Sequence, residues 1–251
     1  MIRTLSYFRS VYRNRMKLID YPRFLTYIVT FACNARCIMC DSWKKYNCQD
    51  LKVDEIQQIF KQLPEMDAVR LSGGEPFLRK DLHEIVETTQ KLLNPKVLHI
   101  TSNGFLTDRI MEFCEKRDKK KTLNLLISLD AKGEKHDRVR GKKGAWQKAS
   151  HSISLLAPLQ KKLNIKLSVN QTITDNNGLE DYVELRDFLK PFGIKNNVVI
   201  AYDESATYSA NEEINLVKNK NDFSSFGNIT NESFEKLAKE IEQDLKNYTL
   251  G

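Results

Sequence analysis

Three cysteines crowd into eight consecutive positions of this 251-residue chain. Cys33, Cys37 and Cys40 follow an apolar, strand-like run with the spacing C-x3-C-x2-C. Thiolates are ligands for zinc and for iron–sulfur clusters, but a closed site of either kind normally takes four protein ligands. Three thiolates leave one metal coordination position free for a substrate or a cofactor. The spacing therefore predicts a metal site built for chemistry.

An iron–sulfur cluster best explains a site with only three thiolate ligands. Three thiolates in a short loop can hold three irons of a [4Fe–4S] cube and leave the fourth iron open. Two other interpretations remain: a zinc ion whose ligand set is completed by a distant His or Asp, and cysteines that meet by coincidence in a core. Asn34 and Arg36 argue against a purely structural loop, because both are poor residues in a buried turn.

The composition indicates a reduced protein that does not cross a membrane. Five cysteines are too few and too unevenly placed for a disulfide framework. Cys48 and Cys114 lack cluster spacing, and a small buried apolar role is favoured for both. The most apolar stretch, 24–32, is too short for a membrane span, and the first twenty residues lack the continuous apolar core of a secretory signal. We therefore expect a cytoplasmic protein.

The net charge of +7 raises the question of a nucleic-acid partner. Lys and Arg are spread along helical segments, however, and the basic clusters at 117–121 and 142–143 are short. A solvated basic surface is favoured, and nucleic acid is not expected as a partner. Basic charge near the metal site would also suit an anionic cofactor carboxylate.

Six apolar, β-branched runs of strand length alternate with helical patterns. The runs are 25–31, 68–71, 97–101, 123–129, 165–172 and 198–201. Apolar positions with a period of 3.6 predict helices between them, and the apolar strands indicate a parallel sheet covered on its faces. We expect an α/β fold, a partial (β/α)6 TIM-like barrel with parallel strands and outer helices. Periodicity alone does not establish closure.

Polar motifs follow nearly every predicted strand. They are the cysteine loop at 33–40, Gly-Gly-Glu-Pro at 73–76, Ser-Asn-Gly at 102–104, Ser-Leu-Asp at 128–130, Asn170 with Thr172, and Tyr-Asp-Glu at 202–204. The carboxyl ends of parallel strands meet at one face, which is where barrels place their active sites. The motifs are therefore expected to surround one site.

The cysteine triplet and Gly-Gly-Glu-Pro together resemble the radical S-adenosylmethionine (radical SAM) superfamily, over about residues 27–202. The resemblance implies a [4Fe–4S] cluster held by the three cysteines, whose open iron chelates the amino and carboxylate groups of SAM. It further implies that the reduced cluster splits SAM into methionine and a 5′-deoxyadenosyl radical, which abstracts hydrogen from a substrate. An outside electron donor, such as a flavodoxin or ferredoxin, would supply the electron.

The resemblance also implies contacts between Gly-Gly-Glu-Pro and SAM. Carbonyls near Gly74 and the side chain of Glu75 would accept hydrogen bonds from the SAM ammonium group. Gly73 would allow close backbone approach, and Pro76 would fix the turn. Taken alone, the motif is more typical of a plain strand-to-helix turn. Its position one β/α unit after the cysteines favours the cofactor role.

The stretch 128–141 resembles the SAM-contacting segment of SPASM-type peptide modifiers. By this match Ser128 and Arg140 contact the SAM carboxylate, which an Arg can clamp with two parallel donors, and Asp130 belongs to the same motif. The alternative for Arg140 is an ordinary surface charge. Further expected ribose or adenine contacts are Met39, Ser102, Asn103 and Asn170.

The predicted organisation has three parts: a basic N-terminal extension at 1–22, a radical SAM core at 23–203, and a linker with a C-terminal helix at 204–251. SPASM-type members carry a Cys-rich C-terminal extension, whereas no Cys follows Cys114 here. Two explanations are open, a minimal one-cluster enzyme and a chain that stops before such an extension. The amphipathic helix expected at 230–248 favours the second.

We therefore expect a radical SAM enzyme that acts on an unidentified small molecule or peptide, with Tyr202, Asp203 and Glu204 as candidate substrate contacts. One rival is an iron–sulfur electron carrier or redox sensor without SAM chemistry, which would need a fourth ligand and has no use for Gly-Gly-Glu-Pro. The other is a zinc-stapled basic module that binds nucleic acid, which lacks the expected aromatic and basic surface pattern.

Overall fold

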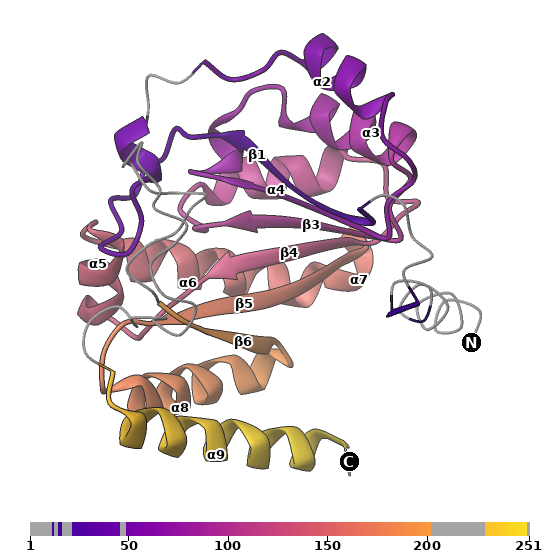
Figure 1. Cartoon of the computed structure of the whole chain (residues 1–251). Helices are drawn as coiled ribbons and strands as arrows, with labels where there is room; N and C mark the ends of the chain where they lie inside the picture. Colours follow the sequence, from indigo (N-terminus) through magenta and orange to yellow (C-terminus); the bar gives the residue numbers. More distant parts are fainter. Residues whose placement is uncertain (1–11, 13–14, 17–21, 46–48, 202–228, 250–251) are drawn as a thin grey trace, which may run out of the picture.

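The computed structural model describes residues 12, 15–16, 22–45, 49–201 and 229–249. Six parallel strands form one open sheet in the order β1-β2-β3-β4-β5-β6, so each strand pairs with the next one along the chain (Figure 1). The strands are β1 (Phe24–Thr30), β2 (Ala68–Gly73), β3 (Val97–Ser102), β4 (Leu123–Ser128), β5 (Ile165–Ile173) and β6 (Lys195–Ile200). This arrangement confirms the predicted partial α/β barrel.

Helices connect the strands and lie on the outside of the sheet (Figure 1). They are α2 (Val53–Phe60), α3 (Leu82–Leu92), α4 (Thr107–Lys116), α5 (Glu134–Arg140), α6 (Ala145–Leu156), α7 (Gln160–Leu163) and α8 (Gly178–Leu189), followed at the end by α9 (Asn231–Thr249). Short 3-10 segments are η1 (Ser42–Lys45), η2 (Pro76–Leu78), η3 (Ala157–Leu159) and η4 (Lys190–Phe192). Crossover helices of this kind are what parallel strands require.

The two faces of the sheet differ in polarity, which corrects the expectation of apolar strands covered on both faces. In β5, Ile165, Leu167 and Val169 are buried, whereas the alternating positions 166, 168 and 170 are more exposed. Successive side chains of a strand point to opposite faces, so each strand turns its apolar side outward to the helices and its polar side inward. β6 begins at Lys195, three residues before the predicted apolar run at 198–201, because the polar residues 195–197 also pair with β5.

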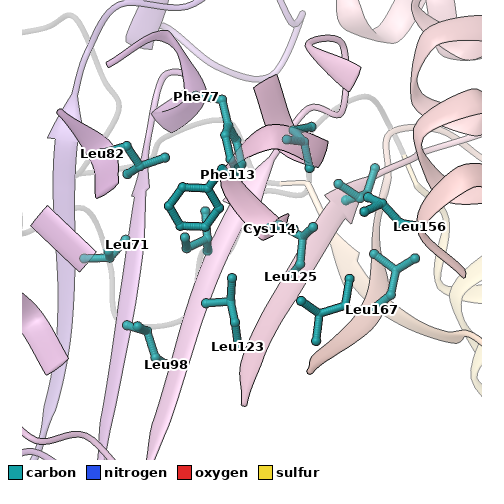
Figure 2. Close-up of a cluster of buried hydrophobic side chains, with 14 of the residues drawn as sticks. Leu71, Phe77, Leu82, Leu98, Phe113, Cys114, Leu123, Leu125, Leu156 and Leu167 are labelled. Carbon is teal, nitrogen blue, oxygen red and sulfur yellow. The ribbon is translucent and has the colours of Figure 1, made fainter. Parts of the chain in front are cut away.

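One hydrophobic core lies between the outer face of the sheet and the helices. Figure 2 shows part of it, with Leu71, Leu98 and Leu125 from neighbouring strands facing Phe113 and Cys114 of α4. Cys114 has no exposed surface, and burial raises the pKa of its thiol to about 11. A thiol in such surroundings is protonated and inert. The predicted apolar role of Cys114 is confirmed.

The predicted C-terminal amphipathic helix is α9, and it packs against α8 on the outside of the fold (Figure 1). Leu237 is buried in a small apolar cluster with Tyr182, and Arg186 of α8 pairs with Glu240 at 2.6 Å and with Asp244 at 3.1 Å. The partner surface of this helix therefore lies within the chain. Within the described ranges, no helix is long and apolar enough to cross a membrane.

Candidate active site

The cysteine loop leaves the carboxyl end of β1, and a hydrogen-bond donor faces each of its three sulfurs. The backbone N–H of Ala35 donates to Cys33 Sγ at 3.4 Å, and the N–H of Ser42 donates to Cys40 Sγ at 3.5 Å. Arg140 Nη1 donates to Cys37 Sγ at 3.6 Å. Donors directed at sulfur stabilise the thiolate form and are among the groups that tune iron–sulfur centres.

Gly-Gly-Glu-Pro packs directly against this loop at the end of β2. The N–H of Gly74 donates to the carbonyl of Thr30 at 2.8 Å, and the N–H of Glu75 donates to the carbonyl of Ala32 at 2.8 Å. A Cβ atom on Gly73 would overlap the Thr30 carbonyl oxygen, and one on Gly74 would overlap that of Ala32. The glycines are therefore needed for the backbone of the cysteine loop to come this close.

Glu75 lies beneath the site and binds the end of β3. Its carboxylate has no exposed surface and accepts hydrogen bonds from the N–H of Asn103 at 2.7 Å, Ser102 Oγ at 2.9 Å and the N–H of Phe77 at 3.1 Å. Burial raises the pKa of Glu75 to about 7, although the three donors oppose the shift. In this structure Glu75 positions Ser102 and Asn103, and its side chain does not line the cavity described below.

The end of α5 is joined to the cysteine loop through the backbone. The N–H of Arg36 donates to the carbonyl of Arg140 at 2.9 Å, and the N–H of Ile38 donates to that of Val139 at 3.0 Å. Gly141 ends α5 with a φ of +58°, and a Cβ atom there would overlap the Arg36 carbonyl oxygen. This glycine therefore serves both as the left-handed helix cap and as the point of close approach.

Asp130 holds the Arg140 guanidinium in place. Asp130 Oδ2 lies 2.6 Å from Arg140 Nε, and Oδ1 accepts from Nη2 at 2.7 Å. Burial acts to lower the pKa of Arg140, but the neighbouring Asp130 and Cys37 outweigh it and raise that pKa, so the guanidinium is charged. Two hydrogen bonds fix Asp130 in turn. The backbone N–H of Asp130 donates to His136 Nδ1 at 3.1 Å, and the backbone N–H of Thr172 donates to Asp130 Oδ1 at 3.1 Å.

These elements enclose a cavity of about 240 Å³ at the carboxyl ends of the strands. The predicted site residues that line it are Cys33, Cys37, Met39, Cys40, Gly73, Gly74, Ser102, Asn103, Ser128 and Arg140. They come from the loop after β1, from the carboxyl ends of β2, β3 and β4, and from α5, which the sheet order brings to one end of the fold. The strand-end motifs thus meet around one space, as the barrel geometry predicts.

Other predicted residues lie elsewhere. Pro76 is buried at the start of η2, and Asp130 stands behind Arg140. Asn170 lines a second cavity further down the inner face of the sheet. Cys48 and the predicted substrate contacts at 202–204 lie outside the described residues.

Several residues of the cavity were not predicted as site residues. They are Ala35, Ser42, Trp43, Ser72, Thr101, Thr172, Val199, Ile200 and Ala201. Trp43 stands three positions after Cys40, and its buried Nε1 has no hydrogen-bond partner among the described residues. Thr172 was visible in the sequence only as a polar residue near a strand end. The aliphatic members carry no signal that separates them from core residues.

The donor set fits an iron–sulfur cluster better than a single metal ion. Across the residues that the structure describes, no three metal-ligating side chains converge as they would on one ion. A cubane cluster binds each thiolate to a different iron, so its cysteines need only surround a common space, as these three do. Burial raises the pKa of Cys33 to about 11, and it raises those of Cys37 and Cys40 as well. Binding iron would therefore release protons.

Similar proteins agree with this chemistry. The family model of the radical SAM superfamily matches residues 27–189. A GTP 3′,8-cyclase from Aquifex aeolicus is 30% identical over 223 residues, which are 80% of this chain and 66% of that protein. An AdoMet-dependent heme synthase from Methanosarcina barkeri is 28% identical, with 70% of this chain and 49% of that protein covered.

Solved structures agree on the fold. Streptococcus suis SuiB bound to S-adenosylmethionine superposes with a TM-score of 0.67 at 17% identity, covering 98% of this chain and 53% of SuiB. A radical SAM methyltransferase from Sphaerobacter thermophilus gives a TM-score of 0.60 at 12% identity, covering 85% of this chain and 61% of that one. The chain thus spans about half to two thirds of these four proteins. Because the family model covers more than half of the chain, and the cysteine loop lies within it, the chain belongs to the radical SAM superfamily.

Proposed function

We propose that this protein binds a [4Fe–4S] cluster through Cys33, Cys37 and Cys40 and uses it to cleave SAM reductively. The observation that carries the proposal is that all three sulfurs and the charged Arg140 line one cavity, and that a donor faces each sulfur. When bound, the cluster supplies the electron that converts SAM to methionine and a 5′-deoxyadenosyl radical. Membership of the superfamily supports this chemistry.

Arg140 is suited to bind the carboxylate of SAM. A guanidinium has five N–H donors; here Nη2 donates to Asp130 Oδ1, Nη1 donates to Cys37 Sγ, and Nε lies 2.6 Å from Asp130 Oδ2 in the ion pair. Each terminal nitrogen keeps one further N–H, and charge-assisted hydrogen bonds from such donors are the strong ones. Asp130 fixes the plane of the guanidinium, so little side-chain entropy remains to be lost on binding.

The described residues around the cavity favour an enzyme over an electron carrier. A closed four-thiolate centre would need another cysteine, and the one other cysteine in the described residues, Cys114, is buried in the core on the outer side of the sheet. The space in front of the cluster loop would instead admit a cofactor and the reacting end of a substrate. An outside reductant of the flavodoxin or ferredoxin class is then required.

The substrate is an unidentified small molecule or peptide. GTP is the first candidate to assay, since several relatives are GTP 3′,8-cyclases by name. Other relatives and neighbours act on other molecules by name, among them the heme synthase and SuiB, which has also been solved with its precursor peptide SuiA. Reductive cleavage of SAM is therefore the part of the proposal that can be tested before the substrate is identified.

The test is anaerobic reconstitution with iron and sulfide, followed by incubation with SAM and dithionite. The wild-type chain should hold about four irons and four sulfides and release 5′-deoxyadenosine, because the cubane contains four of each. Cys37→Ala should lose both the cluster and the product. Cys114→Ala is the matched control and should keep both, since its thiol is buried in the core and does not line the cavity. Zinc without sulfide in the wild type, or unchanged SAM cleavage in Cys37→Ala, would refute the proposal.

A further inference from the structure

A second, larger cavity continues from the first along the inner face of the sheet. Its volume is about 670 Å³, and it shares Ser72, Thr101 and Val199 with the cavity in front of the cysteines. The two spaces are therefore contiguous. A molecule in the lower cavity would reach the place where the cysteines and Arg140 lie.

The lining of this lower cavity is basic and polar. We call it the inner basic surface; it comprises Arg70, His99, Asn124, Lys166, Asn170, Lys195 and Asn197. No Asp or Glu lines this cavity within the described part of the chain. The interior of a closed barrel is instead filled by layers of bulky aliphatic side chains. The composition of this surface therefore calls for a partner that carries the opposite charge.

The strand register aligns these residues in one row. Arg70 of β2 is opposite His99 of β3, His99 is opposite Asn124 of β4, and Asn124 is opposite Lys166 of β5. Lys195 of β6 is opposite Ser168, two positions further along β5. Adjacent strands are about 4.8 Å apart, so the row from Arg70 to Lys166 spans about 14 Å along the sheet. A row of this length offers its donors to several anionic groups at once.

His99 lies in the middle of the row with an unused hydrogen-bonding atom. Its Nδ1 is buried and has no partner in the described residues. Burial and the positive charges of Arg70 and Lys166 lower the pKa of His99, which places both cations within electrostatic reach of the imidazole. A neutral imidazole between two cations can donate to an oxyanion from one of its nitrogens.

From these observations we infer that the inner basic surface binds a substrate that carries two or more linked anionic groups, such as an oligophosphate chain. Arg70, Lys166 and Lys195 contact its charged oxygens, and His99 and the amides donate further hydrogen bonds. The rest of the substrate extends through the shared part of the two cavities toward the cysteine loop. That the bound anion is a substrate rests on the proposed function, whereas the anion site itself does not.

The binding experiment uses inorganic tripolyphosphate as the probe, with citrate as a polycarboxylate comparison, titrated into the reconstituted protein by calorimetry. We expect tripolyphosphate to bind and its affinity to fall as salt rises, because exposed charge pairs are screened. Binding of citrate alone would assign the same site to a polycarboxylate. Binding of neither would overturn the inference.

The variant Arg70→Gln/Lys166→Gln/Lys195→Gln tests the location of the site. All three side chains are exposed on the inner face, so the fold should tolerate the changes. We expect at least tenfold weaker binding of the anion. Lys91→Gln/Lys161→Gln/Lys162→Gln removes the same charge from exposed positions on α3 and α7 and should bind as the wild type does. Equal weakening in both triple variants, or none in the first, would overturn the inference.

Production of 5′-deoxyadenosine separates this inference from the proposed function. The first triple variant should still cleave SAM with dithionite in the absence of substrate, since none of the three residues lines the cofactor cavity. Anion binding without SAM cleavage in the wild type would refute the proposed function and leave the anion site standing. SAM cleavage without anion binding would overturn the anion site and leave the proposed function supported.

Discussion

Arg140 and Asp130 form a two-point ion pair, 2.6 Å from Nε to Oδ2 and 2.7 Å from Nη2 to Oδ1, in which both residues are at least nine-tenths buried. Truncating one member of such a pair leaves the other charge without a partner. Arg140 donates to Cys37 Sγ and lines the cavity, whereas Asp130 does not line the cavity and holds the guanidinium in place.

Replacing Arg140 by Ala should weaken SAM binding by at least tenfold, because two charge-assisted hydrogen bonds of about 1.5 kcal/mol or more each are removed. Iron content should be unchanged, since Arg140 donates to Cys37 but is not a ligand. Equilibrium dialysis with labelled SAM measures the first quantity and iron analysis the second. Arg138→Ala, an exposed residue of the same helix, is the control. Unchanged SAM affinity in Arg140→Ala would remove this residue from the site.

Glu75→Gln should destabilise the protein by about 1–3 kcal/mol, the usual cost of an unsatisfied buried group. The Glu75 carboxylate accepts three hydrogen bonds, and an amide must turn its NH₂ group toward at least one of those donors. Urea unfolding measures the change. Glu84→Gln on the exposed side of α3 is the control and should not change the urea midpoint of unfolding. A stable Glu75→Gln protein would show that the β3 end does not depend on this carboxylate.

Gly74→Ala should be among the most damaging small substitutions in the chain. Its Cβ atom would overlap backbone atoms of Phe31 and Ala32, which cannot rotate away as a side chain can, so we expect a loss of about 3 kcal/mol or more. Gly193→Ala is the comparison. Gly193 has a φ of +61° but no atoms within 4 Å of a Cβ, so only conformational strain of about 1 kcal/mol is expected. Similar melting temperatures for the two variants would contradict this account.

Asp67 should make stability depend on pH in the acid range. Its hydrogen bonds to Arg23 lower the pKa of Asp67 to about 2, with Lys96 adding to the effect. A lowered carboxyl pKa gives stability that is complete above the unfolded pKa, about 3.9, and is lost as the pH falls through the folded value. The denaturant midpoint of unfolding should therefore fall as the pH is lowered from 5 to 2. Asp67→Asn should make this midpoint depend less steeply on pH, and an unchanged pH dependence would exclude Asp67 as its source.

Local patterns in the sequence are sufficient to predict the strand order and the meeting of the cysteine loop with Gly-Gly-Glu-Pro. Cys33, Cys37 and Cys40 are close in the chain, and Gly-Gly-Glu-Pro immediately follows a strand, so their meeting follows from parallel β/α connectivity alone. The predicted end of β6, at Ala201, was within one residue of the observed one. The spacing of residues in the sequence predicts contacts between residues that are close in the chain and contacts that the order of the strands imposes.

Contacts that depend on side-chain direction could not be predicted. Glu75 turns to the β3 end instead of into the cavity, because its carboxylate accepts from the N–H of Asn103. Asn170 is opposite Ser128 in the strand register, yet it lines the second cavity whereas Ser128 lines the first. The basic inner face was hidden for a similar reason. Lys166 and Arg70 alternate with strongly apolar neighbours, so each strand still has the composition of a buried one.

The backbone bonds from Arg36 to Arg140 and from Ile38 to Val139 have a thermodynamic consequence. They join the cysteine loop and the end of α5 into a single structural unit, so ordering one orders the other. If the cluster strengthens SAM binding by some factor, linkage requires that SAM strengthen retention of the cluster by the same factor. SAM would then protect this protein from loss of iron, and the size of that protection would measure how rigidly the two segments are joined.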